Sequence, residues 1–279
     1  MAKRFFLSRT FLITIATIFG ILAYAYLWGT QTVLAFTLRH QAKKLFILRE
    51  KPVPLRSIPV NSDEGVTLVH SDFAFEVPWQ DIDLANCKYG GNMAVFRFRS
   101  GRTIDFFGPG KNHEGLLSAL EKSTGNDNGD LRRLFGEEAT KTDYAFHRTL
   151  LEATPDDVTP FESQREAIRS SMLLMVKAIS SIGGETGLFE LDSKDWNGFQ
   201  FDDPSMKPKK VTLELYDSED RHVEILFYSD SMSSSEITQA DINRTIQTLR
   251  RTKEPQTIPL ENTFQKQQAD TQSSGAGSQ

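Results

Sequence analysis

The side chains best suited to chemistry in this sequence are one cysteine and five histidines. A thiolate beside an imidazole can act as an activated nucleophile, so Cys87, His113 and His147 are the candidates for a dispersed active site. The histidines are scattered, and no two have the spacing that places a pair of metal ligands on one helix face. A single cysteine also excludes an intramolecular disulfide and a multi-cysteine metal cluster. We therefore expect no cofactor and no metal, and an inert thiol is the simpler interpretation of Cys87.

The most suggestive loop is the glycine-rich segment 108–115, between an expected strand and an expected helix. Backbone amides at a helix start can hold a phosphate. However, a dinucleotide-binding fingerprint requires glycine at the position of His113, and a P-loop requires serine or threonine at that of Asn112. The segment is therefore interpreted as a turn with Lys111 in solvent.

Two pairs of adjacent aspartates, at 156–157 and 202–203, have the residue type that general acid–base catalysis needs. The first pair follows Thr154 in the first turn of an expected helix, where the helix dipole favours carboxylates. The second pair precedes Pro204 and is typical of a turn. The sequence has no Gly-x-Ser-x-Gly motif, so neither the acids nor the hydroxyls predict an enzyme.

The elements that must position these side chains are strands, then helices, then further strands. Two pairs of alternating segments, 93–99 with 102–107 and 211–216 with 222–228, are typical of hairpins. The pattern predicts an α+β fold in which a mainly antiparallel sheet of two hairpins plus extra strands packs against helices. The remaining expected strands cover residues 73–79, 187–191 and 198–201.

Aromatic residues mark the expected core. Most of the 20 phenylalanines fall on the inward faces of these strands, so core packing explains them. Trp79 and Trp196 stand at strand ends. Together with His113 they are the candidates for lining a binding groove.

Two helices have the clearest sequence signals. The longer one is predicted to follow Thr159 and to end at the glycine pair 183–184. The last helix is predicted to begin at Thr238, whose hydroxyl can accept a hydrogen bond from the amide of Asp241. The expected inner face of the longer helix contains Phe161, Ile168, Met172, Met175, Val176, Ile179 and Ile182. That of the last helix contains Ile242, Ile246 and Leu249.

Charge is distributed unevenly along the 279 residues. Residues 1–56 contain nine basic side chains and one acidic side chain, a net charge of +8. The whole chain contains 32 basic and 37 acidic side chains, so the remainder has 23 and 36, a net charge of −13. Such asymmetry is typical of a membrane-facing or nucleic-acid-facing end joined to a differently solvated domain. The acidic remainder argues against nucleic acid.

The basic residues of 1–56 lie on both sides of an uncharged segment, residues 10–38. About 20 apolar residues cross the hydrocarbon core of a bilayer as a helix. Residues 10–30 are therefore predicted to be a transmembrane helix that acts as an uncleaved signal anchor; a cleaved signal peptide and a buried helix are the alternatives. Aromatic side chains favour the headgroup region, and those expected there are Tyr24, Tyr26 and Trp28.

Residues 31–59 are predicted to be a basic juxtamembrane stalk and a proline-containing linker. The stalk is either a basic interfacial helix on anionic headgroups or a plain helical continuation of the span. We favour an extracytoplasmic domain, because a short tail with three cations is costly to translocate. A literal count of the cations that follow the span would instead keep the domain in the cytoplasm. The cations expected at the interface are Arg39, Lys43 and Lys44.

The predicted organisation is a basic flank at 1–9, a span at 10–30, the stalk and linker at 31–59, an α+β domain at 60–255 and a disordered tail at 256–279. An anchor without an intact catalytic motif favours a non-catalytic domain that binds a protein or an envelope component. The alternatives are a membrane-anchored enzyme with a dispersed site and a cytoplasm-facing domain held to anionic lipid. The expected partners are the lipid bilayer and a protein or envelope component, not nucleic acid.

Overall fold

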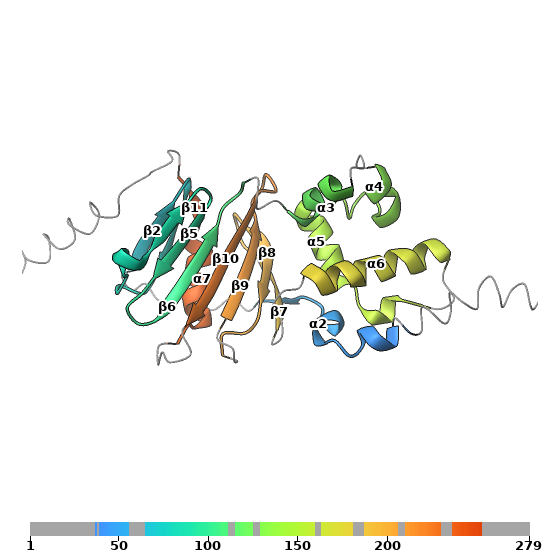
Figure 1. The fold of residues 1–279 in the computed structure, drawn as a ribbon, viewed down its shortest axis with the longest axis horizontal. Coiled ribbons are helices and arrows are strands. Elements are labelled where there is room, and N and C mark those ends of the chain that lie inside the picture. The colour runs from blue at the N-terminus through green and yellow to red at the C-terminus, as the bar shows by residue number, and fades with distance from the viewer. Residues whose placement is uncertain are drawn as a thin grey trace, which may run out of the picture. The chain divides into compact units, whose positions relative to one another are not determined.

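Internal contacts divide the chain into two compact units in the computed structural model (Figure 1). The helical unit takes its described residues from 37–51 and 149–180, and the sheet unit takes its described residues from 52–148 and 187–252. The structure describes residues 37, 39–55, 65–110, 115–124, 129–159, 163–180, 187–205, 210–229 and 236–252.

An eight-stranded sheet forms the centre of the sheet unit, in the order β1-β7-β8-β9-β10-β6-β5-β4. Every pair except β1 with β7 is antiparallel. The two predicted hairpins are β5–β6 and β9–β10, and they join where Ile225 lies opposite Phe106. The predicted α+β fold with a mainly antiparallel sheet is confirmed. The strands are β1 (Val53–Pro54), β4 (Lys88–Gly90), β5 (Met93–Arg97), β6 (Arg102–Phe107), β7 (Leu188–Asp192), β8 (Asn197–Phe201), β9 (Lys210–Tyr216) and β10 (His222–Ser229).

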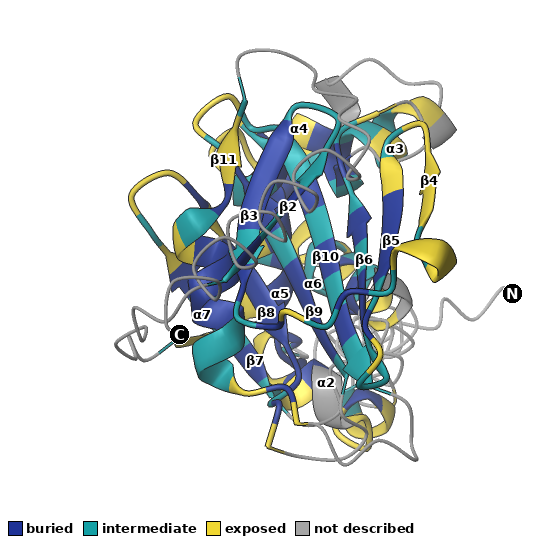
Figure 2. Cartoon of the chain, turned by 90° about the vertical axis from the view of Figure 1, so that its left-hand side faces the viewer, coloured by how far each residue is buried: buried dark blue, intermediate teal, exposed yellow. Residues whose placement is uncertain are grey.

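A small sheet and helix α7 (Gln239–Thr248) share one core with the large sheet. Buried residues are dark blue in the cartoon of Figure 2. The Phe75 ring stacks on that of Phe106 at 5.6 Å and meets that of Phe96 edge-on at 5.9 Å. Burying one such side chain contributes about 1.5–3 kcal/mol, so the aromatic inner faces stabilise the fold as expected. The small sheet has the order β11 (Arg250–Arg251), β3 (Phe73–Val77) and β2 (Val66–His70).

Helix α7 begins at Thr238, as predicted. The Thr238 hydroxyl accepts a hydrogen bond from the amide of Asp241 at 3.3 Å, and the Asp241 carboxylate accepts one from the amide of Thr238 at 2.8 Å. This reciprocal pair is a capping box. The predicted inner face, with Ile242, Ile246 and Leu249, is buried.

Two other helices of the sheet unit begin at side chains that are distant in the sequence. The Asp143 carboxylate accepts a hydrogen bond from the amide of Leu117 at 2.7 Å, at the start of α3. The amide of Tyr144, at the start of α5, donates to Asp220 at 3.1 Å. These carboxylates satisfy amides that a helix leaves without an internal partner. The helices are α3 (Leu116–Thr124), α4 (Gly129–Phe135) and α5 (Asp143–Glu152), of which α5 belongs to the sheet unit through residue 148.

A buried lysine organises the helical unit. Lys177 is fully buried. Its ammonium donates to the backbone carbonyls of Glu50 at 2.7 Å, Leu151 at 2.6 Å and Ala153 at 2.9 Å. These bonds use the three donors of the ammonium and join segments far apart in the sequence. The elements here are α2 (Phe46–Arg49), the 3-10 turn η2 (Pro155–Asp157) and α6 (Gln164–Ser180).

The predicted inner face of the longer helix, α6, is wrong at two positions. Ile168 and Met175 are 46% and 55% exposed, whereas Leu173 and Leu174 are buried beside Lys177. Apolar residues occur on several sides of this helix, so their spacing alone does not select one face. The carbonyls that receive the Lys177 ammonium favour a different rotation.

Several predicted segments lie outside the described residues, namely the span at 10–30 and the tail at 256–279. No helix of the described part of the chain is long and apolar enough to cross a membrane. Within the predicted stalk and linker, the structure describes α2 and β1. Strand β1 pairs with β7, so this part of the linker belongs to the large sheet.

Candidate functional site

The cations predicted at the membrane interface are partly engaged within the protein. Arg39 and Lys43 form ion pairs with Asp156, with nitrogen–oxygen distances of 2.6 and 2.7 Å, and Lys44 is exposed. The predicted site residues that lie outside the described part are Tyr24, Tyr26, Trp28 and His113.

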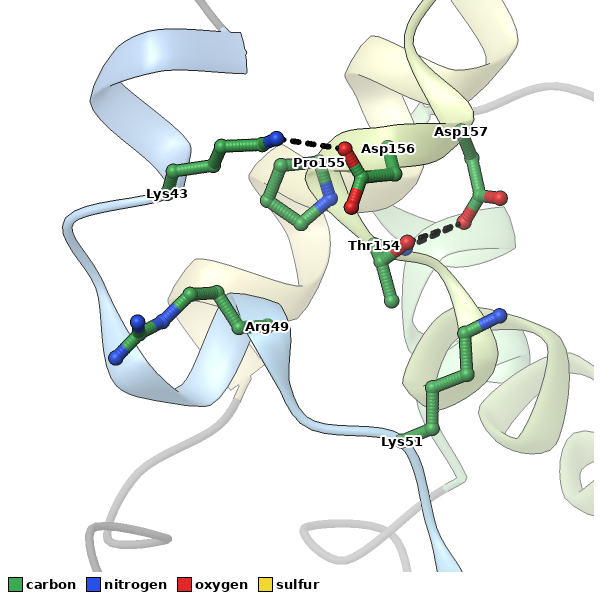
Figure 3. Close-up of a pocket in the computed structure, with 7 residues that line it drawn as sticks. All are labelled: Lys43, Arg49, Lys51, Thr154, Pro155, Asp156 and Asp157. Atoms are coloured by element: carbon green, nitrogen blue, oxygen red, sulfur yellow. Dashed lines mark hydrogen bonds and ion pairs between the residues drawn. The ribbon is translucent and has the colours of Figure 1, made fainter.

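The helical unit contains a polar cavity of about 580 Å³ beside these ion pairs (Figure 3). Lys43 and Arg39 lower the pKa of the exposed Asp156 carboxyl by hydrogen bonding to it. The neighbouring Asp157 carboxylate accepts hydrogen bonds from the amide and hydroxyl of Thr154, at 2.6 and 2.9 Å. Both acids are therefore engaged in the 3-10 turn η2, which stands where the sequence predicted the start of a helix. The lining residues are Lys43, Arg49, Lys51, Thr154, Pro155, Asp156 and Asp157.

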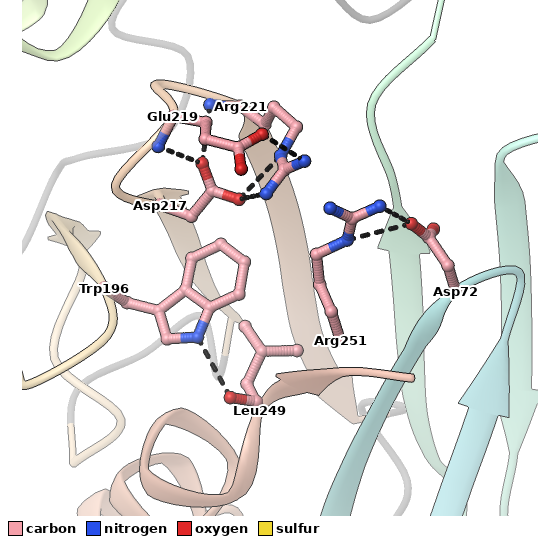
Figure 4. A network of polar contacts seen from close by, with 7 residues as sticks. All are labelled: Asp72, Trp196, Asp217, Glu219, Arg221, Leu249 and Arg251. Atoms are coloured by element: carbon pink, nitrogen blue, oxygen red, sulfur yellow. Dashed lines mark hydrogen bonds and ion pairs between the residues drawn. The ribbon is translucent and has the colours of Figure 1, made fainter. Parts of the chain in front are cut away.

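Trp79 and Trp196, the candidates for a groove, are both buried. The Trp196 indole donates a hydrogen bond to the carbonyl of Leu249 at 2.9 Å (Figure 4), and this bond holds the end of α7. The Trp79 ring packs edge-on against that of Phe98 at 5.0 Å. Both indoles act as core residues, and the groove that they would line with His113 remains a prediction.

A polar network lies close to Trp196 (Figure 4). Asp217 accepts hydrogen bonds from the backbone amides of Glu219 and Arg221, at 2.9 and 3.0 Å, and pairs with the Arg221 guanidinium at 2.6 Å. Arg251 pairs with Asp72 at 2.6 Å. These contacts fix the β9–β10 turn and attach β11 to the β2–β3 turn, so their role is structural.

Cys87, the candidate nucleophile, is partly buried beside β5. Its sulfur accepts a hydrogen bond from the amide of Arg97 at 3.4 Å and donates one to the carbonyl of Asp83 at 3.3 Å. Among the described residues, no hydrogen bond or ion pair joins it to a histidine. The pairing with His147 that a catalytic Cys87 would need is absent among the described residues, and His113 lies outside the described part.

His147 lies at the centre of a buried polar cluster beneath α5. Its Nδ1 shares a 2.9 Å hydrogen bond with the Tyr216 hydroxyl and lies 3.2 Å from Oε2 of Glu214. The same carboxylate oxygen lies 3.5 Å from Nε2 of His222. The sequence suggested His147 as a catalytic candidate, but only the β9–β10 register brings Glu214, Tyr216 and His222 to it.

Burial dominates the electrostatics of this cluster. It lowers the pKa of His147, an effect that the Glu214 charge opposes and that His222 adds to. Burial likewise raises the pKa of Tyr216 well above its usual range. A neutral imidazole oriented by a carboxylate has the chemistry of a general base. However, His147 is only 3% exposed, and the rings of Phe199 and Phe201 lie 5.0 and 6.1 Å from its own. No group of three or more His, Cys, Asp or Glu side chains in the described residues is arranged to hold a metal.

A second cavity, of about 470 Å³, lies at the β4 end of the large sheet. We call it the cationic cavity. Its lining contains four basic side chains and one carboxylate, a formal charge of +3. It is formed by the 3-10 turn η1 (Leu84–Asn86), by β4 and by the β5–β6 hairpin. The charged lining residues are Lys88, Arg97, Arg99, Arg102 and Asp83.

Strand register aims two of these cations to the same side. Lys88 lies opposite Val95, which is two residues before Arg97. Because alternate residues of a strand share a face, Lys88 and Arg97 project from the face opposite to buried Ala94 and Phe96. The sequence signal was the density of arginines at 97, 99 and 102 around the hairpin turn, which our sequence analysis did not use.

The remaining charges of the cationic cavity are held in place. The Arg102 guanidinium lies 4.9 Å from the centre of the Trp79 ring and donates to the Ser100 hydroxyl at 3.2 Å. The Asp83 carboxylate accepts a hydrogen bond from the Asn86 amide at 2.7 Å. Within the described residues, the side chains of Lys88 and Arg99 form no ion pair. The cavity therefore offers charged donors to an anion.

Comparisons with protein-family models, with curated proteins and with solved structures yield no match for this chain.

Proposed function

We propose that the chain is a single-pass membrane-anchored protein whose sheet unit binds a protein or envelope component without catalysis. The observation that carries this proposal is the contrast between two polar clusters. The cationic cavity is open and contains cations without ion-pair partners among the described residues. His147, which has the better catalytic residue type, is only 3% exposed and is flanked by the rings of Phe199 and Phe201.

One observation supports membrane attachment. Residues 10–38 contain no charge and are long enough to include a spanning helix. The alternative of a domain held to anionic lipid only by juxtamembrane cations is weakened by the pairing of Arg39 and Lys43 with Asp156.

Two measurements on the full chain test the proposal. Reporters that are active on only one side of the membrane, fused to the C-terminus, are expected to show an extracytoplasmic sheet unit. A broad hydrolase and transferase screen of the purified chain is expected to show no turnover. A chain that is absent from the membrane fraction, or one that turns over a substrate, would contradict the proposal.

An enzyme is the second candidate function, and one distance favours it. His147 Nδ1 lies 3.2 Å from the Glu214 carboxylate, within the range expected of a base and its orienting acid. If the screen detects turnover, His147→Gln is expected to abolish it while the fluorescence of buried Trp196 stays unchanged. Turnover that survives this substitution would exclude His147 as the base.

A further inference from the structure

We propose that the cationic cavity binds an acidic, extended peptide segment of a partner protein, an inference that rests on the binding function proposed above.

Charge is the first argument. The cavity has a formal charge of +3, although residues 57–279 together have a net charge of −13. A concentration of cations against the sign of the surrounding domain attracts anions locally and repels basic surfaces. Because Lys88 and Arg99 form no ion pair in the described part of the chain, an incoming carboxylate does not have to displace an internal partner.

Rigidity is the second argument. The amide of Arg99 donates to the carbonyl of Asp81 at 2.9 Å, and the amide of Ser100 donates to the Asp81 carboxylate at 2.6 Å. The Arg102 guanidinium lies against the Trp79 ring. The hairpin turn that presents the arginines is therefore fixed before a ligand arrives. A preorganised site loses less conformational entropy on binding.

The surroundings of the cavity favour a peptide over a free anion. Leu84, which follows the lining residue Asp83, is 37% exposed, and Met93, the first residue of β5, is 38% exposed. Strand β4 is exposed throughout and ends the sheet (yellow in Figure 2), with β5 as its one neighbour among the described strands. An extended peptide can use apolar contacts, edge hydrogen bonds and cations together. A free phosphate would use the cations alone.

Lys88 also selects the kind of strand that can pair there. A lysine on a short edge strand discourages pairing with neutral or basic strands. An acidic strand can instead form an ion pair between one of its carboxylates and Lys88. The same residue therefore protects the edge from association with a second copy of this chain and admits an acidic segment.

The test uses the full chain in a neutral detergent and two fluorescein-labelled decapeptides. One alternates Glu with Val, and the other has Gln in place of each Glu. Binding is measured by fluorescence anisotropy at low and at raised ionic strength.

The site variant is Arg97→Gln with Arg99→Gln. The control, Arg132→Gln with Lys194→Gln, removes the same charge from exposed positions outside the cavity. Far-UV circular dichroism confirms that both variants fold.

We expect the Glu peptide to bind and the Gln peptide not to bind. The site variant should weaken the Glu peptide by about tenfold or more, because two charge-assisted hydrogen-bonding groups are lost. The control should change the Kd by less than about twofold, since exposed charges at a distance are screened. Raised salt should weaken binding to the wild type more than to the site variant.

Four results would overturn the proposal. These are equal binding of the two peptides, an unchanged Kd in the site variant, no binding of any probe, and binding of inorganic tripolyphosphate at Arg97 and Arg99 without any peptide binding. The last result would identify a phosphate site instead. If no probe binds while the chain fractionates with membranes and turns nothing over, only this ligand assignment fails and the proposed binding function stands.

Discussion

Lys177 determines how one helix packs. A buried ammonium requires acceptors for its donors, and the carbonyls of Glu50, Leu151 and Ala153 provide them. These carbonyls lie far from Lys177 in the sequence, so no local pattern predicts that a lysine will occupy the buried face of α6. The exposure of Ile168 and Met175 follows from that choice.

The pH dependence of the helical unit should reflect this lysine. Burial lowers the pKa of Lys177 from 10.5 to about 8, the nearby Lys51 adds to the decrease, and Asp157 and Glu50 oppose it. Between these two pH values the unfolded chain binds more protons than the folded chain, so the free energy of unfolding rises with pH. The whole difference in pKa corresponds to about 3.5 kcal/mol, at about 1.4 kcal/mol for each pKa unit. About 2–3 kcal/mol of it is expected between pH 8 and pH 10.5, because titration is half complete at each end of that interval.

Hydrogen exchange of α6 amides, corrected for the intrinsic rate at each pH, measures this rise. Lys177→Met should abolish it because no titrating group remains at the position. Lys44→Met, which removes an exposed lysine from the same unit, should retain it. A rise of equal size in Lys177→Met would show that another group is responsible.

Whether the start of a helix could be predicted depends on how far its capping side chain lies along the sequence. The capping box of α7 joins residues 238 and 241, which are near neighbours, so the residue types alone reveal it. The carboxylates at the starts of α3 and α5 come from Asp143 and Asp220, 26 and 76 residues away from Leu117 and Tyr144. Such caps depend on tertiary structure, and the corresponding boundaries could not be predicted.

Strand pairings within a hairpin could be predicted, and pairings between distant strands could not. Each of the two hairpins was predicted because it has a local turn. The pairing of β10 with β6, which joins the hairpins, is long-range. Strand β2 was missed because the apolar Val69 follows Leu68 and interrupts the alternation of its five residues. Strands β1, β4 and β11 have only two or three residues, too few for a period to be visible.

The cap of α7 can be tested through its contact with Trp196. Thr238→Ala removes the acceptor for the Asp241 amide, and loss of such a cap costs about 1 kcal/mol. The Trp196 indole bonds to Leu249 at the end of α7, and Trp79 lies in the same core, so urea unfolding followed by intrinsic tryptophan fluorescence reports on the core that α7 joins. Gln247→Ala, at an exposed position of α7, should change stability by less than about 0.5 kcal/mol. Equal effects of the two substitutions would contradict a specific role for the cap.

The candidate sites depend on the assembled sheet unit more than on any motif. His147 was suggested by its residue type, but its partners Glu214 and Tyr216 come from a hairpin that follows it by more than 60 residues. The cationic cavity combines η1, an edge strand and a hairpin turn, so the sequence shows its arginines without showing that they meet. The net charge of the chain gave no hint of it, because a local charge of +3 is hidden within an acidic total.

Deletion of residues 1–36 tests how the complete chain attaches to membranes. The proposed anchor lies in the segment 10–38, which contains no charge and is long enough to include a spanning helix. The full chain should stay in the membrane fraction after carbonate and high-salt washes, whereas the shortened chain should become soluble. The shortened chain should still unfold cooperatively, because the core of the sheet unit is built from residues between 66 and 249 and Lys177 bonds to the carbonyls of Glu50, Leu151 and Ala153. A shortened chain that remains bound until salt is added would instead support attachment through the cations of residues 39–51 to anionic lipid.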